Sequence, residues 1–248
     1  MKHHETGIDV NNSRRHNPRI GLIALASDVL VERDFWRMGL AAGVDIITTR
    51  IAQSMPLTPA TLAKLEDGIP DAVRLLLPEA NLDAIVFACT SGSAIIGPAK
   101  IEQTISTLRP GVPITNPASA AVAALQHLGC HKITFIAPYT QDVAEITSSV
   151  FSDAGIGFSD RVCFGLKSDV EIATPGLEHY RRALAEANTA AADAIFLSCT
   201  TAATLDLIAP LEAQTGLPVI TSNQAAFWQA LQLIGRTSSL PEFGRLLA

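Results

Sequence analysis

A nine-residue segment occurs twice in the chain, 110 residues apart, and this repeat limits the possible folds more than any other feature of the sequence. The first copy runs from Leu82 to Thr90 and the second from Ala192 to Thr200. Both copies contain Asp-Ala-Ile, continue with apolar residues and end in Cys-Thr. A short apolar run of this kind is typical of a strand that is buried on both faces. The repeat therefore predicts two similar halves, each with a Cys-Thr pair directly after a central strand.

Two further pairs of segments match in the same order along the chain. Lys132–Ala137 is similar to Arg19–Ala24, and Gly216–Thr221 is similar to Gly111–Thr115. Strands alternate with helical patterns throughout, which indicates an α/β fold with parallel sheets. We expect two pseudo-symmetric α/β halves with the active site in the cleft between them. The expected division is a disordered tail at 1–17, a first half at 18–117 plus 221–248, and a second half at 118–220.

The composition excludes several classes of protein. The net charge is −6 and no run of lysine or arginine occurs, which argues against a nucleic-acid partner. No apolar run reaches the ~18 residues that a membrane span needs. The polar stretch from Met1 to Asn17 has no apolar core like that of a signal peptide, so we expect a cytoplasmic protein. The four cysteines lack the spacing of a zinc site, and we expect no metal and no cofactor.

Ligands of open α/β sheets bind outside the carboxyl ends of the strands. Polar residues gather in the loops that this rule selects, and hydroxyls follow both cysteines. These residues predict a site for a small substrate that carries a carboxylate. The loops are Ser27-Asp28, Cys89 to Ser93, Tyr139-Thr140 and Cys199 to Thr201.

The equivalent positions of Cys89 and Cys199 suggest a pair of reactive thiols. We expect a helix to begin after each cysteine, where its N-terminus would lower the thiol pKa and attract a carboxylate. One thiolate could remove a proton from a carbon while the opposite thiol supplies one to the other face. Alternatively, one thiolate could add to a double bond and leave after rotation. The competing interpretation is that both cysteines are small core residues.

The Cys-Thr loops and the Pro138-Tyr139 loop resemble the Asp/Glu racemase superfamily. Within it, the sequence resembles the branch that holds maleate cis–trans isomerases, arylmalonate decarboxylases and the ectoine-utilisation (EutA) proteins. The segments Gly21 to Asp28, Glu32 to Phe35 and Thr221 to Ala225 are most similar to the ectoine-utilisation proteins. The resemblance extends from about Arg19 to Gly235.

The resemblance implies a role for several residues. Cys89 and Cys199 match the two catalytic cysteines of the isomerases, and the decarboxylases also keep the second. Tyr139 matches a tyrosine that hydrogen-bonds the substrate or intermediate. The hydroxyls that match the carboxylate-binding group are those of Thr90, Ser91 and Thr200.

Two acidic residues depart from the maleate isomerase pattern. Asp28, and in our alignment Asp169, stand where those enzymes carry asparagine. Carboxylates in a cleft disfavour a dianion and favour a cationic group, such as an ammonium or the amidinium of a cyclic ectoine. Asp28 could instead cap a helix.

These inferences lead to one favoured function and two alternatives. We expect a cofactor-independent racemase or isomerase in ectoine or hydroxyectoine degradation, with two cysteines as acid and base. Its substrate would be a small amino-acid-like carboxylate, and the protein would form a homo-oligomer. The alternatives are an enzyme of the maleate isomerase or arylmalonate decarboxylase type, and a non-catalytic protein that binds ectoine-like ligands.

Overall fold

The computed structural model describes residues 17–248, which contain two parallel four-stranded sheets. The strand order is β2-β1-β3-β4 in one sheet and β6-β5-β7-β8 in the other. The same order in both confirms the predicted α/β class with two pseudo-symmetric halves. The strands are β1 (Arg19–Leu25), β2 (Asp45–Ile51), β3 (Ala84–Phe87), β4 (Ile114–Thr115), β5 (Lys132–Tyr139), β6 (Gly157–Leu166), β7 (Ala194–Leu197) and β8 (Val219–Thr221).

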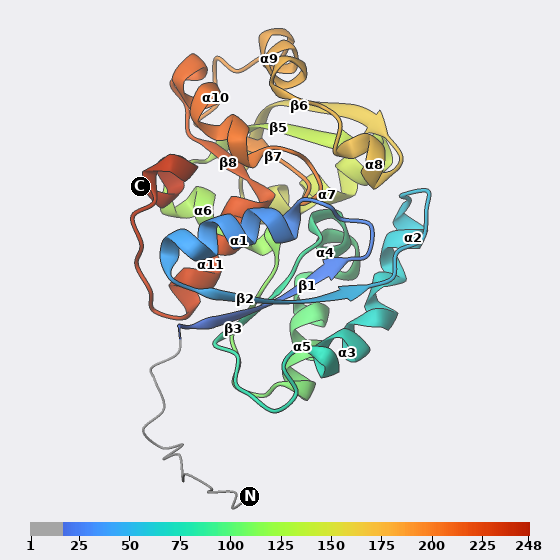
Figure 1. Cartoon of the computed structure of the whole chain (residues 1–248). Coiled ribbons are helices and arrows are strands. Elements are labelled where there is room, and N and C mark those ends of the chain that lie inside the picture. Colours follow the sequence, from blue (N-terminus) through green and yellow to red (C-terminus); the bar gives the residue numbers. More distant parts are fainter. Residues whose placement is uncertain (1–16) are drawn as a thin grey trace, which may run out of the picture.

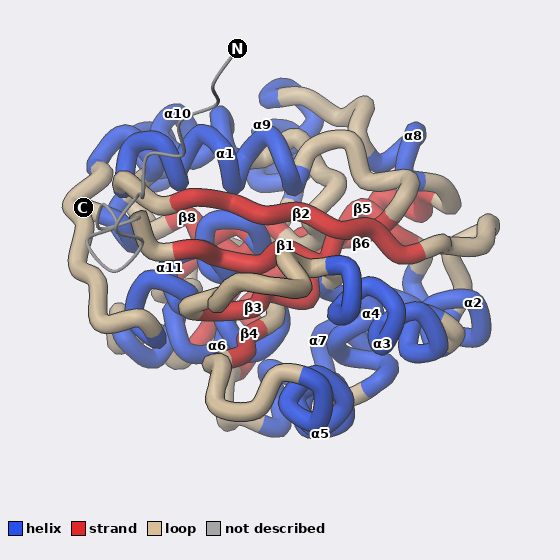
Figure 2. The backbone as a smooth tube through the Cα atoms, turned by 60° about the horizontal axis from the view of Figure 1, so that its bottom comes forward, coloured by secondary structure: helices blue, strands red, loops and turns tan. Residues whose placement is uncertain are grey.

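Helices flank the sheets, and the strands run through the middle of the molecule (Figure 2). The helical stretch that follows β3 is divided at Gly97, whose φ of +95° a helix does not allow, and Pro98 begins the next helix. The helices are α1 (Val31–Ala42), α2 (Pro59–Ala63), α3 (Leu65–Leu75), α4 (Thr90–Ile96), α5 (Pro98–Leu108), α6 (Pro117–His127), α7 (Gln141–Asp153), α8 (Asp169–Ile172), α9 (Leu177–Glu186), α10 (Ile208–Thr215) and α11 (Ser222–Leu233); 3₁₀ turns are η2 (Leu205–Leu207), η3 (Pro241–Phe243) and η4 (Arg245–Leu247).

The two central strands, β3 and β7, are buried along their whole length. The repeated aspartate fixes the entry of each strand. A side-chain oxygen of Asp83 accepts the N–H of Arg19 at 2.7 Å, and one of Asp193 accepts the N–H of Lys132 at 2.9 Å. Asp83 thus ties β3 to β1, and Asp193 ties β7 to β5. Both contacts lie at the end of the central strand opposite the cysteine.

The helix α11 follows β8 of the second sheet but packs against elements of the first half (Figure 1). It contacts α1 and β3 of that half, and also α6, which the predicted division assigns to the second half; the ring of Phe227 meets that of Phe35 edge-on at 5.7 Å. The division of the chain at 117 and 221 stays a prediction: the contacts with α1 and β3 favour it, whereas the contact with α6 crosses it. The first turn of α11 lies between the two sheets and, as described below, reaches both cysteine loops.

The predicted tail at 1–17 lies outside the described residues except for Asn17. The side chain of Asn17 donates to a carboxylate oxygen of Asp45 at 3.1 Å. No helix within residues 17–248 combines the length and apolar character that a membrane span requires.

The C-terminal segment is held against α11 at Gly244, which provides a test of the packing. Gly244 and Gly111 both have a positive φ, at 91° and 79°. A Cβ on Gly244 would lie 2.3 Å from the Ile208 side chain, whereas one on Gly111 would meet nothing within 4 Å. We expect Gly111→Ala to lower the free energy of unfolding by about 1–2 kcal/mol, from backbone strain alone. Gly244→Ala should lower the free energy of unfolding by ~1–3 kcal/mol more than Gly111→Ala does, because the added Cβ also overpacks the contact with Ile208.

Urea denaturation of both variants measures the difference. Equal losses in the two variants would contradict the close packing of the C-terminal segment on α10 and α11.

Candidate active site

Cys89 lies at the end of β3 and caps the N-terminus of α4. Its sulfur accepts the N–H of Gly92 at 3.2 Å, and the Ser91 hydroxyl lies 3.9 Å from the sulfur. A Cβ at Gly92 would lie 2.9 Å from the Cys89 sulfur, so only glycine leaves the thiol its place. The expectation that a helix begins after the cysteine is correct for this half.

Cys199 lies at the end of β7 but is followed by a loop rather than a helix. The chain bends through residues 200–204, and regular structure resumes only at η2. The prediction of a helix N-terminus at this cysteine is therefore wrong. Cys199 itself has a φ of +97°, which side-chain-bearing residues rarely adopt. Its N–H donates to the Ser222 hydroxyl at 3.0 Å.

The two thiols line one small cavity between the halves. Its volume is about 10 Å³, which is close to the space that one water needs. Seven of the eight predicted site residues line it; Asp28 does not. The predicted residues on the lining are Cys89, Thr90, Ser91, Tyr139, Asp169, Cys199 and Thr200, and the others are Leu25, Gln53, Leu57, Leu62 and Thr201.

Burial raises the pKa of both thiols. The pKa of Cys89 rises to about 12, chiefly because burial disfavours the thiolate, although the Gly92 N–H and Ser91 lower it. The pKa of Cys199 rises well above its ordinary value because of burial and then the charges of Asp169 and Asp28. The expected lowering by helix N-termini is thus outweighed by desolvation. Both sulfurs are therefore neutral thiols at physiological pH.

The hydroxyls around the thiols differ in their freedom to bind a ligand. Thr90 donates its hydrogen to Ser222 at 2.8 Å, and Thr200 donates to the carbonyl of Ala88 at 3.4 Å. The Tyr139 hydroxyl is hydrogen-bonded to Ser198. Thr90 and Thr200 therefore tie the two cysteine loops together. Ser91, near the Cys89 sulfur, remains better placed than either threonine to donate to a carboxylate.

The two acidic residues are both buried beside the cavity. One oxygen of Asp28 accepts the N–H groups of Leu30 and Val31 at 2.8 and 2.9 Å, while the other is buried without a partner. One oxygen of Asp28 therefore satisfies N–H groups at the start of α1, and the other oxygen remains a free hydrogen-bond acceptor. Asp169 accepts a hydrogen bond from Ser27, and its pKa is raised by burial and by the charge of Asp28. Among the described residues, no lysine or arginine side chain forms an ion pair with either carboxylate.

The sequence did not single out three further polar residues of this region. Ser222 and Asn223 contact the Cys199 loop, and only their place in a short resemblance drew attention to them. Tyr180 is buried, its hydroxyl has no partner among the described residues, and the charge of Cys199 contributes to its raised pKa. No local pattern in the sequence distinguishes Tyr180 from an ordinary core tyrosine.

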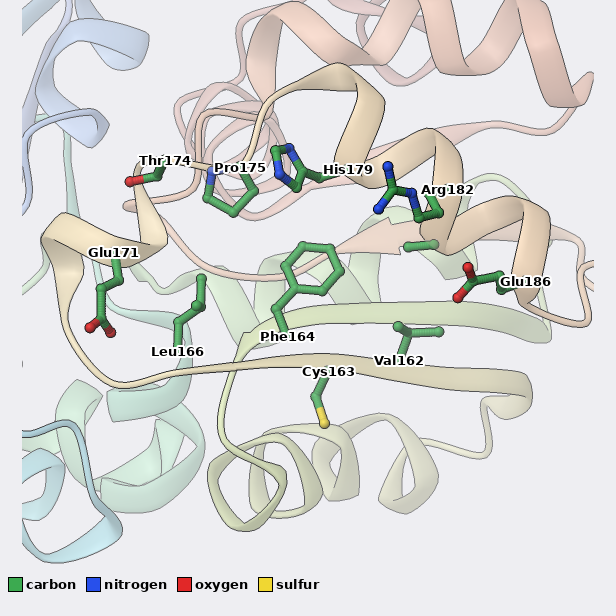
Figure 3. A pocket seen from close by; sticks show the side chains of 11 residues that line it. Val162, Cys163, Phe164, Leu166, Glu171, Thr174, Pro175, His179, Arg182 and Glu186 are labelled. Atoms are coloured by element: carbon green, nitrogen blue, oxygen red, sulfur yellow. The ribbon is translucent and has the colours of Figure 1, made fainter.

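A larger hollow of about 580 Å³ lies elsewhere, on the flank of the second sheet. Its side chains come from one face of β6 and from α8 and α9, and Cys163 points away from α9 (Figure 3). Neither Cys89 nor Cys199 lines it. Size alone would have selected this hollow, but the paired thiols and buried carboxylates lie at the small cavity. Within residues 17–248, no three His, Cys, Asp or Glu side chains are grouped to hold a metal ion.

Comparison with known proteins agrees with this geometry. A family model described as arylmalonate decarboxylase matches residues 44–247. Maleate isomerase from Geobacillus stearothermophilus is 23% identical over 244 residues, covering 93% of this chain and 97% of that protein. Arylmalonate decarboxylase from Bordetella bronchiseptica is 29% identical over 140 residues, covering 55% of this chain and 58% of that protein.

Solved structures share the fold. The crystal structure of maleate isomerase from Pseudomonas putida S16 has a TM-score of 0.84 at 21% identity, covering 93% of this chain and 98% of the other. A liganded double mutant of arylmalonate decarboxylase has a TM-score of 0.80 at 23% identity, covering 93% and 99%.

The fold and these matches place the protein in the maleate isomerase and arylmalonate decarboxylase branch of the Asp/Glu racemase superfamily. The chain belongs to the arylmalonate decarboxylase family, whose model covers most of its length. The relatives named above do not include an ectoine-utilisation protein.

The raised thiol pKa values predict a particular dependence of stability on pH. Between about pH 8.5 and the folded pKa, unfolded thiols lose protons that the buried thiols keep. The unfolded state then binds fewer protons, so the free energy of unfolding falls as pH rises. Each thiol contributes at most about 1.4 kcal/mol per pH unit.

Urea denaturation between pH 8 and 10.5, under reducing conditions, tests this dependence. Cys89→Ser and Cys199→Ser should each make the decline shallower, whereas Cys163→Ser, at an exposed thiol, should leave it as in the wild type. The same slope in all four proteins would show that the two thiols are not buried as described.

Proposed function

We propose that the protein is a cofactor-independent racemase or isomerase that uses Cys89 and Cys199 as its acid and base. The observation that carries the proposal is the placement of two buried thiols, from equivalent positions of the two halves, on one cavity. That cavity has room for about one water, so the two loops would have to move apart to admit a substrate, whose reacting carbon would then have a sulfur on each side. The proposed substrate is a small amino-acid-like carboxylate.

The proposed reaction moves one proton at each face of the substrate. One cysteine, as thiolate, takes the proton from the carbon next to the carboxylate. The opposite thiol then gives its proton to the other face, so the two sulfurs exchange protonation states and no charge is gained or lost. Ser91 and Tyr139 lie on the same cavity and are proposed to bind the carboxylate, where negative charge develops.

The acidic residues support a substrate that also carries a positive charge. Asp28 and Asp169 are buried, and their charges are among the causes that raise the Cys199 pKa. A bound ammonium or amidinium would offset this charge and so favour formation of the thiolate. A dicarboxylate would add to the repulsion. A compound of ectoine or hydroxyectoine degradation, as the sequence resemblance implies, meets this requirement.

A second candidate is cis–trans isomerisation of an unsaturated dicarboxylate. One observation favours it: a structure of the Nocardia farcinica maleate isomerase mutant contains a covalently bound succinylcysteine intermediate. In that reaction a thiolate would form a bond to one alkene carbon, the central bond would rotate, and the sulfur would leave. A decarboxylase needs one proton donor, which leaves the second thiol without a role, and a purely binding protein needs neither thiol.

Replacement of either cysteine tests the two-thiol mechanism. Cys89→Ala and Cys199→Ala should each reduce turnover by at least about 1,000-fold, because each thiol serves one face of the substrate. Turnover is measured by chiral chromatography and proton NMR with ectoine, hydroxyectoine, aspartate, hydroxyaspartate and maleate. Cys163→Ala is the matched control at an exposed thiol and should keep wild-type activity.

An active Cys89→Ala with an inactive Cys199→Ala would indicate a one-thiol reaction such as decarboxylation. Full activity in both variants would remove thiol chemistry altogether.

Replacement of Asp28 by asparagine tests the charge of the substrate. The asparagine oxygen can still accept the N–H groups of Leu30 and Val31, so Asp28→Asn removes the charge but keeps the cap. We expect KM for a cationic substrate to rise about tenfold or more, equal to about 1.4 kcal/mol of lost attraction. Asp71→Asn removes an equal charge at an exposed site and should leave KM unchanged. If Asp28→Asn keeps the wild-type KM for the cationic substrate, the proposed positive charge on the substrate is wrong.

A further inference from the structure

One buried hydroxyl contacts both cysteine loops. Ser222, the first residue of α11, is 0% exposed and does not line the cavity. Its oxygen accepts the N–H of Cys199 at 3.0 Å and the hydroxyl of Thr90 at 2.8 Å. Thr90 directly follows Cys89, so a single oxygen is bonded to the loop of each thiol.

The Cys199 loop needs such support because its backbone is strained. A φ of +97° is costly for a residue with a side chain and persists only where surrounding contacts enforce it. Ser222 accepts the N–H of Cys199, which belongs to the peptide on the N-terminal side of that residue. The amide of Asn223 donates to the carbonyl of Thr200 at 2.9 Å and so holds the peptide between Thr200 and Thr201.

The support continues into the first half of the chain. The Asn223 amide also donates to Asp34 at 2.9 Å, and Asp34 is wholly buried on α1. The first turn of α11 is therefore bonded to the Cys199 loop, to the Cys89 loop through Thr90, and to α1. Thr200 adds a direct bond between the loops, to the carbonyl of Ala88, whereas Ser222 contacts both loops from a separate segment of the chain.

We propose that Ser222 is a positioning residue that fixes the two thiols relative to one another. It touches no reacting atom and acts through the Cys199 N–H and the Thr90 hydroxyl. The proposal rests on the proposed two-thiol function, because only a reaction that uses both sulfurs requires their relative placement. The identity of the substrate does not enter it.

Ser222→Ala removes the shared acceptor and leaves both donors without it. We expect kcat to fall about 100-fold, as for a misplacement of about 1 Å, while KM changes by less than about threefold. In the ligand-free protein, iodoacetamide should label Cys199 at least about fivefold faster, because release of the loop lets the strained backbone relax. Peptide mass spectrometry follows each cysteine, and the exposed Cys163 is the internal reference.

Ser148→Ala is the matched control. Ser148 is also a buried serine, but its hydroxyl donates to the Glu145 carbonyl within α7 and forms no hydrogen bond to either cysteine loop among the described residues. Kinetic constants and Cys199 labelling should match the wild type. A double-mutant cycle of Ser222→Ala with Thr90→Val should be non-additive, with the double variant within about threefold of Ser222→Ala alone.

Labelling separates this proposal from the proposed function, because it needs no substrate. Wild-type labelling of Cys199 with unchanged kcat in a folded Ser222→Ala would overturn the positioning role, as would equal effects in Ser148→Ala. If Ser222→Ala does not fold, Thr90→Val decides by Cys89 labelling, since it removes one of the two bonds. Faster labelling supports the role, and unchanged labelling overturns it.

Discussion

The hydroxyl of Ser222 joins the two cysteine loops, and the arrangement of the site depends on this contact. Duplication supplies two similar halves, but symmetry alone does not hold their loops at a fixed separation. The join arises because α11 leaves the second sheet and packs on the first half, which brings its first turn between the sheets. The Gly244 turn then secures the C-terminal segment against the same helix through a hydrogen bond from the Gln224 amide to the Phe243 carbonyl.

Desolvation is the second constraint, and it changes the chemistry expected of the thiols. The cavity holds about one water, so neither sulfur gains the hydration that a thiolate needs. Two buried carboxylates add negative charge to the same region, with no ion-paired cation among the described residues. A reactive thiolate therefore requires a change that the substrate can bring, and a positive charge next to Asp28 and Asp169 is such a change. Burial, rather than a helix N-terminus, sets the resting state of the site.

Much of the fold followed from the sequence because the repeat and the apolar runs report on strands that are buried on both faces. The carboxyl-end rule then brought six predicted residues onto one cavity, and the alignment behind the resemblance added Asp169. Local patterns could not predict the Ser222 contacts, because the hydroxyl of Ser222 meets the Thr90 hydroxyl, 132 residues away in the chain, and the Cys199 N–H, 23 residues away. The loop after Cys199 was missed for a related reason: its backbone conformation is imposed by Ser222 and Asn223 and contradicts the local preference of a cysteine.

In the proposed mechanism, a substrate carbon lies between two thiols, each of which transfers a proton at one face. Proton NMR of the wild-type protein with the candidate substrates in deuterium oxide, separated by enantiomer at early times, tests it most directly. Deuterium is expected in the product enantiomer while the unconverted substrate keeps its proton, because the sulfur that donates is not the one that accepted. A product that retains the original proton at that carbon would contradict the two-thiol mechanism.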